Sequence, residues 1–139
     1  REFVDLDIEI EKREKRPIPD IFSKDGEKYF RNVESAVTAD FCKKSGLIIS
    51  TGGGVVTRDV NHFPVKCNSV VCYIKRDISH LPTEGRPVSQ KTSAEILFES
   101  RKDKYETWCD YEFEIESNSD GISEAAALDC AKNIAAKVM

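Results

Sequence analysis

The chain has 139 residues, of which 40% are hydrophobic and 33% charged, and its formal net charge is -4 at pH 7. These values are typical of one globular domain with a buried core, and they exclude a disordered or fibrous chain. The negative charge argues against nonspecific nucleic-acid binding, so we expect no nucleic-acid partner. No apolar run reaches the roughly 18 residues of a membrane span, so we expect no membrane partner either.

The cysteine pattern argues against a zinc site or a disulfide framework. No two cysteines form a C-x-x-C pair, and the chain has 2 histidines. Scattered thiols of this kind are typical of a reduced, cytoplasmic protein. We expect each to be a small structural side chain: Cys42, Cys67, Cys72, Cys109 and Cys130.

The first third of the chain predicts one strand and three helical segments. Residues 2–7 are short and apolar and predict a strand, and residues 8–15 predict a charged helix that Pro17 and Pro19 end. Residues 18–44 predict a short helix, a turn at Gly26 and a long amphipathic helix. The apolar face of this long helix comprises Phe30, Val33, Val37 and Phe41.

The middle of the chain predicts two further strands. Residues 46–51 form an apolar run that predicts the second strand, and residues 57–65 predict a short helix that ends near Pro64. Residues 69–75 predict the third strand, and residues 76–90 lack periodicity and predict a loop.

The last third predicts a helix over 92–108, an edge strand over 111–117 and an alanine-rich helix over 122–139. Glu95 is placed to complete a capping box at the start of the first of these helices. The predicted N-caps are Thr92 or Ser93 for the first helix and Ser123 or Asp120 for the last.

The alternation of apolar strands and helices predicts a parallel sheet covered by helices on both faces. Ligands bind at the carboxyl ends of the strands in such folds. Two unusual stretches, Asp5–Asp7 and Gly52–Gly54, lie at predicted strand ends. Three consecutive glycines indicate a tight loop or a close approach of a ligand to the backbone, and their place favours the ligand.

Five motifs in this order resemble the shikimate kinase family, and the resemblance runs from residue 2 to about residue 117. It implies a three-layer α/β fold, a parallel sheet flanked by helices in a P-loop kinase of the nucleoside-monophosphate-kinase-like class. One domain would span 1–139, with a lid loop over 76–90. The motifs are D-L-D at 5–7, F-x-x-x-G-E-x-x-F-R-x-x-E at 22–34, T-G-G-G at 51–54, R-P at 86–87, and Arg101 with Tyr105 and Asp110.

The resemblance implies ATP-dependent phosphorylation of the 3-hydroxyl of shikimate in aromatic amino-acid (chorismate) biosynthesis. Shikimate is a small carboxylated triol, ATP is the co-substrate and Mg²⁺ the metal, and we expect a monomer. Arg31 and Arg101 would hold the carboxylate, because an arginine fork binds a carboxylate bidentately. Glu34, three residues after Arg31 on the same helix face, would hold that arginine in place.

The remaining site residues are assigned by the same resemblance. Asp7 would accept hydrogen bonds from ring hydroxyls and take or orient the proton of the attacking hydroxyl. Asp5 would hold Mg²⁺ through water. The backbone of Gly52, Gly53 and Gly54 would lie against the ring. Arg86 would bind the ATP phosphates and stabilise charge in the transition state.

Each of these residues also has an ordinary structural interpretation. Arg31 and Glu34 could form a surface ion pair worth less than ~1 kcal/mol, and Asp5 and Asp7 could form a strand-end turn that caps the next helix. Arg101 could be one solvated charge among several. Arg86 could be an ordinary loop residue beside Pro87, and His62 is expected to be structural or exposed. The motifs favour the site only when they are taken together.

The sequence also departs from the family pattern. It contains no G-x-x-x-x-G-K-[ST] phosphate loop, and it opens where the second strand of the family is expected. We therefore expect the natural protein to carry a first strand and P-loop upstream. The lid is short, and Asp103–Lys104 replaces a usual Pro-Leu. Two alternatives stay open: a catalytically inactive shikimate-binding or scaffold domain, and another small-molecule kinase such as gluconate kinase.

Overall fold

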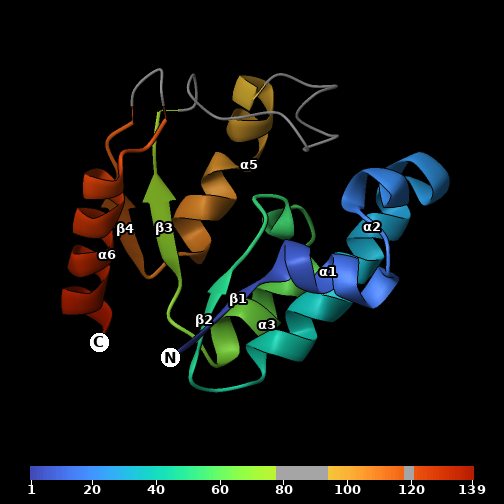
Figure 1. Ribbon diagram of the computed structural model, residues 1–139, viewed down its shortest axis with the longest axis horizontal. Helices are drawn as coiled ribbons and strands as arrows, with labels where there is room; N and C mark the ends of the chain where they lie inside the picture. The colour runs from blue at the N-terminus through green and yellow to red at the C-terminus, as the bar shows by residue number, and fades with distance from the viewer. Residues whose placement is uncertain (78–93, 118–120) are drawn as a thin grey trace. The chain divides into compact units, whose positions relative to one another are not determined.

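The computed structural model describes residues 1–77, 94–117 and 121–139. These residues form two compact units, Arg1–Ser69 and Val70–Met139. Each unit contains its own pair of parallel strands, β1 with β2 and β3 with β4 (Figure 1). The parallel pairing agrees with the predicted α/β class, and a single domain over 1–139 stays a prediction. The predicted lid loop 76–90 lies, from residue 78 on, outside the described residues.

In the first unit, β1 (Glu2–Asp5) pairs in parallel with β2 (Leu47–Ser50). The predicted strand over 2–7 was too long, because Asp5 ends β1 by capping α1 (Leu6–Glu14). Its Oδ1 accepts the backbone N–H groups of Asp7 at 2.9 Å and Ile8 at 3.3 Å. The cap satisfies two amides that have no partner inside a helix, so the helix begins two residues before the predicted start.

The long second helix, α2 (Ile18–Cys42), provides three of the six residues of the buried core cluster of this unit. Gly26 has non-helical angles, φ 81° and ψ 174°, which confirms the predicted turn between a short helix and a long one. The predicted apolar face is also confirmed, since Phe30 and Val37 are buried and Val33 and Phe41 pack against them. The buried core cluster comprises Val4, Leu6, Ile10, Ile21, Phe30 and Val37.

The segment after β2 contains two 3₁₀ turns, η1 (Val55–Thr57) and η2 (Asp59–Asn61), and then α3 (His62–Cys67). The prediction of one helix that ends near Pro64 was wrong. Pro64 instead lies in the first turn of α3, where its missing N–H costs nothing and its fixed φ suits the helix.

In the second unit, β3 (Cys72–Lys75) pairs with β4 (Tyr111–Glu114), accompanied by α5 (Ala94–Trp108) and α6 (Glu124–Val138). α6 packs against β4. Ser123 caps α6 through a hydrogen bond from the amide of Ala126 at 3.1 Å, which confirms one of the two predicted caps. The other candidate caps lie outside the described residues: Thr92, Ser93 and Asp120.

Candidate functional site

The two unusual stretches of the sequence, Asp5–Asp7 and Gly52–Gly54, meet at the carboxyl ends of β1 and β2. Asp5 at the end of β1 is the register partner of Ser50 at the end of β2. A Cβ built on Gly52 would lie 3.2 Å from Oδ1 of Asp7 and 3.6 Å from Oε1 of Glu34. The structure therefore brings the aspartate pair, the glycine run and α2 together, as the strand-end argument predicts.

Arg31 is the central cation of this cluster and is 9% exposed. Its Nη1 donates to Oε2 of Glu34 at 2.7 Å, and its Nη2 donates more weakly to Oε1 of Glu27 at 3.5 Å. Its guanidinium also lies 5.1 Å from the ring centroid of Phe30. Glu34 is 3% exposed, so this is a buried ion pair and not the surface pair that was the alternative interpretation. Such a pair is retained only when its geometry and hydrogen bonds are good.

One donor of Arg31 is left for a ligand. Its Nε is buried and has no hydrogen-bond partner among the described parts of the chain. A buried donor without an acceptor costs about 1–3 kcal/mol, so an acceptor brought by a ligand would recover this energy. A guanidinium has five N–H donors arranged to match a carboxylate or phosphate. Arg31 is therefore suited to bind an anionic group.

The glycine turn is packed directly against this guanidinium. A Cβ at Gly54 would lie 2.6 Å from Cζ of Arg31, too close for any real contact. Gly54 has ordinary angles, φ -84° and ψ -8°, so the backbone does not require a glycine there. The turn is fixed by the amide of Thr57 donating to the carbonyl of Gly54 at 3.0 Å. An alanine at position 54 would therefore force the Arg31 guanidinium or the turn to shift.

The other predicted site residues differ in how far they are placed. Gly53 is exposed in the turn. Asp5 acts as the N-cap of α1, which is the alternative role predicted for it. Arg101 is half-buried on α5 in the second unit. Arg86 lies outside the described residues.

The donors available for a metal are the carboxylates at the end of β1. Asp5 and Asp7 supply hard oxygen atoms of the kind that Mg²⁺ prefers, and Mg²⁺ binds through few protein ligands because it keeps several waters. Within residues 1–77, 94–117 and 121–139, no group of three His, Cys, Asp or Glu side chains is arranged to hold a metal ion by itself. By donor type, the carboxylates of Asp5 and Asp7 fit a hard divalent cation.

Two residues of the site were missed or undervalued in the sequence. Glu27, which contacts Arg31, was missed as a partner, although its spacing of four residues before an arginine on a helix indicates such a pair. Asn61 was assigned no role, and the structure buries it to 1% exposure with its side chain donating to the carbonyl of Val55. No spacing rule in the sequence predicts that contact.

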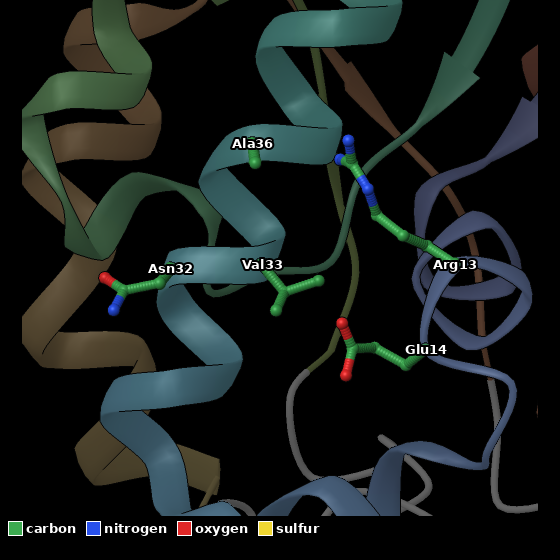
Figure 2. A pocket seen from close by; sticks show the side chains of 5 residues that line it. All are labelled: Arg13, Glu14, Asn32, Val33 and Ala36. Atoms are coloured by element: carbon green, nitrogen blue, oxygen red, sulfur yellow. The ribbon is translucent and has the colours of Figure 1, made fainter.

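A hollow of about 210 Å³ lies elsewhere in the first unit, between α1 and α2. Figure 2 shows Val33 of α2 on one side and Arg13 and Glu14 of α1 on the other. Arg13 pairs with Asp40 at 3.0 Å, and Glu14 accepts a hydrogen bond from the Tyr29 hydroxyl that raises the pKa of that phenol. Arg13 and Glu14 thus each have a partner already, so the hollow offers much less to an anion than the guanidinium of Arg31.

Solved structures share this fold. The chain aligns over its whole length with 82% of shikimate kinase from Acinetobacter baumannii in complex with shikimate, at a TM-score of 0.81 and 26% identity. It also aligns over 96% of its length with 82% of shikimate kinase from Aquifex aeolicus, at a TM-score of 0.68 and 30% identity. These matches confirm the predicted fold class.

Sequence comparison agrees with the structural matches. The chain is 37% identical to a shikimate kinase of Oceanobacillus iheyensis over 143 aligned positions, which cover 92% of this chain and 77% of that protein. It is 35% identical to a shikimate kinase of Clostridium botulinum over 113 aligned positions, which cover 77% of this chain and 68% of that protein. The family model described as shikimate kinase matches residues 1–136. Because the family model covers nearly the whole chain and these relatives are more than 30% identical to it, the chain belongs to the shikimate kinase family.

Proposed function

We propose that the protein transfers a phosphoryl group from ATP to the 3-hydroxyl of shikimate, giving shikimate 3-phosphate in aromatic amino-acid biosynthesis. One observation carries the proposal: Arg31, nearly buried and with an Nε that has no partner among the described residues, lies against a glycine turn and close to two carboxylates. A carboxylated polyol requires this combination, a cation for its carboxylate and acceptors for its hydroxyls.

In this proposal Arg31 binds the carboxylate of shikimate. Glu34 holds the guanidinium at 2.7 Å, so the fork is oriented before the ligand arrives and little side-chain entropy is lost on binding. The turn Gly52–Gly54 presents backbone with no Cβ, so the flat face of a small ring can approach it. By resemblance to the family, Arg101 would supply a second cation for the same carboxylate.

Catalysis would depend on positioning and charge, which are nearly all that phosphoryl transfer requires. Asp7, whose carboxylate lies beside Gly52, would accept the proton of the attacking hydroxyl or orient it. Arg86 would bind the phosphates of ATP and stabilise the charge that develops. Asp5 would hold Mg²⁺ through water, and the metal, when bound, would neutralise phosphate charge.

The proposed partners are small molecules, shikimate and ATP, and the protein is proposed to act as a monomer in the cytoplasm. The family supports the ligands, and the scattered thiols support the compartment. Among the helices of the described ranges, none is long and apolar enough to cross a membrane.

The direct test is shikimate-dependent release of ADP by the purified protein in the presence of Mg²⁺ and ATP, accompanied by calorimetric titration with shikimate. Turnover with shikimate supports the kinase. Shikimate binding without turnover would support an inactive binding domain instead. A preference for gluconate over shikimate in a competition assay would show that the substrate has been assigned wrongly.

Replacing Gly54 by alanine tests the close approach of the turn to Arg31. The new methyl group must displace the guanidinium or the turn, because it would lie 2.6 Å from Cζ. A displacement of this size costs up to roughly 100-fold in function. We expect the Kd for shikimate, measured by calorimetry, to rise by at least roughly tenfold.

Gly46→Ala is the matched control, because it has the opposite properties. Gly46 has a φ of 79°, which strains any alanine, and nothing lies within 4 Å of its Cβ position. This variant should lose about 1 kcal/mol of stability and keep its affinity for shikimate. Equal Kd values for Gly54→Ala and the unsubstituted protein would contradict the assigned contact.

A further inference from the structure

We propose that Asn61 is a positioning residue for shikimate binding, one that sets the place of the glycine turn relative to Arg31. This inference rests on the proposed function, since it concerns the same site. Asn61 is 1% exposed, and its Nδ2 donates to the carbonyl of Val55 at 2.8 Å. Val55 directly follows Gly54, the glycine that packs against the Arg31 guanidinium. The hydrogen bond from Asn61 therefore holds the chain one residue after that contact.

The side chain of Asn61 is not used for the local purpose that its position suggests. Asn61 is the residue before α3, the N-cap position at which asparagine is among the preferred residues. It nevertheless makes no side-chain cap bond to that helix. Its carboxamide instead reaches back six residues to the turn. Burial of an amide is costly unless it is hydrogen-bonded, so the bond to Val55 accounts for an asparagine in this buried place.

Other contacts hold the same segment from different sides. The Oγ1 of Thr57 donates to the carbonyl of Gly54 at 2.6 Å, and the amide of Val55 donates to the carbonyl of Gly52 at 3.2 Å. Arg58 donates from Nη1 to Oδ1 of Asn32 at 2.7 Å, which ties the segment to α2 beside Arg31. Thr57 and Arg58 are accessible to water, and Asn61 provides the buried bond. Its loss would therefore release the turn more than the loss of either of the others.

Asn61→Leu removes the donor and keeps the branched shape and the number of heavy atoms of the side chain. We expect the Kd for shikimate, measured by calorimetry at a temperature where circular dichroism shows the variant folded, to rise roughly tenfold. We also expect amide exchange, followed by NMR, to quicken at Val55 and Thr57 more than in the core of α2. Asn61→Ala serves as a second variant if the Asn61→Leu protein does not fold.

Asn68→Leu is the matched control for a purely structural role. The Nδ2 of Asn68 donates to carbonyls at the end of α2, among them Lys44 at 3.2 Å, and it does not contact the turn. This variant should lose stability and keep its Kd. If the unsubstituted protein binds shikimate and Asn61→Leu and Asn61→Ala bind it equally well, the inference is overturned alone. If the unsubstituted protein does not bind shikimate, the proposed function fails, and this inference is overturned with it.

Discussion

Arg31→Lys is expected to weaken shikimate binding by roughly 100-fold while the protein remains folded. Lysine keeps one positive charge for Glu34 but replaces a planar fork by a single ammonium group, which cannot hold a carboxylate bidentately. Hydrogen bonds to charged groups contribute about 1.5–3 kcal/mol each, and the upper value corresponds to roughly 100-fold in Kd. Calorimetric titration with shikimate gives the Kd, and thermal melting monitors the fold.

The choice of lysine avoids a second effect that an alanine would introduce. Removing the cation altogether would break the buried ion pair with Glu34, which is 3% exposed, and the loss of one partner of such a pair costs about 3–5 kcal/mol and risks unfolding the protein. Arg13→Lys is the matched control, because Arg13 lies on α1, is 48% exposed and pairs with Asp40. That variant should bind shikimate normally. A similar loss in both variants would mean that Arg31 does not contact the substrate.

The fold was largely predictable because its elements follow simple periodic rules. The apolar face of α2 and its break at Gly26 were read from spacing and from the one residue that adopts a φ of 81° at no cost. The ends of elements were less predictable, since they depend on single hydrogen bonds. Asp5 could equally have continued β1 or capped α1, and the 2.9 Å bond to the amide of Asp7 decides for the cap.

The candidate site was predictable where neighbours in sequence or in the sheet decide the contacts. Arg31 and Glu34 are one helical turn apart, and the register of Asp5 with Ser50 follows from parallel pairing. The role of Asn61 was not predictable, because its contact with Val55 depends on two successive 3₁₀ turns. The sequence specifies those turns without a recognisable period, so only coordinates reveal which carbonyl the side chain reaches.

In the proposed mechanism, Asp7 takes part in the chemical step and lies on a different helix from the residue that binds the carboxylate. Its carboxylate lies near Gly52, in the first turn of α1, where the helix N-terminus favours negative charge. Arg31 and Glu34 lie on α2 and already pair with each other. The carboxylate of the substrate would therefore be bound by α2 and its reacting hydroxyl by α1. A substitution of Asp7 should leave the contacts of the substrate carboxylate intact.

Asp7→Asn should accordingly lower kcat on the order of 1,000-fold and change the Kd for shikimate little. Asparagine keeps the size of the side chain and can still accept a hydrogen bond, but it cannot take a proton, and general-base assistance contributes about 100- to 10,000-fold. Steady-state ADP release and calorimetry measure the two quantities separately. Glu9→Gln, which neutralises a half-buried carboxylate in the same helical turn, is the control and should leave kcat unchanged. An Asp7→Asn variant with nearly normal kcat would show that the proton leaves the hydroxyl by another route.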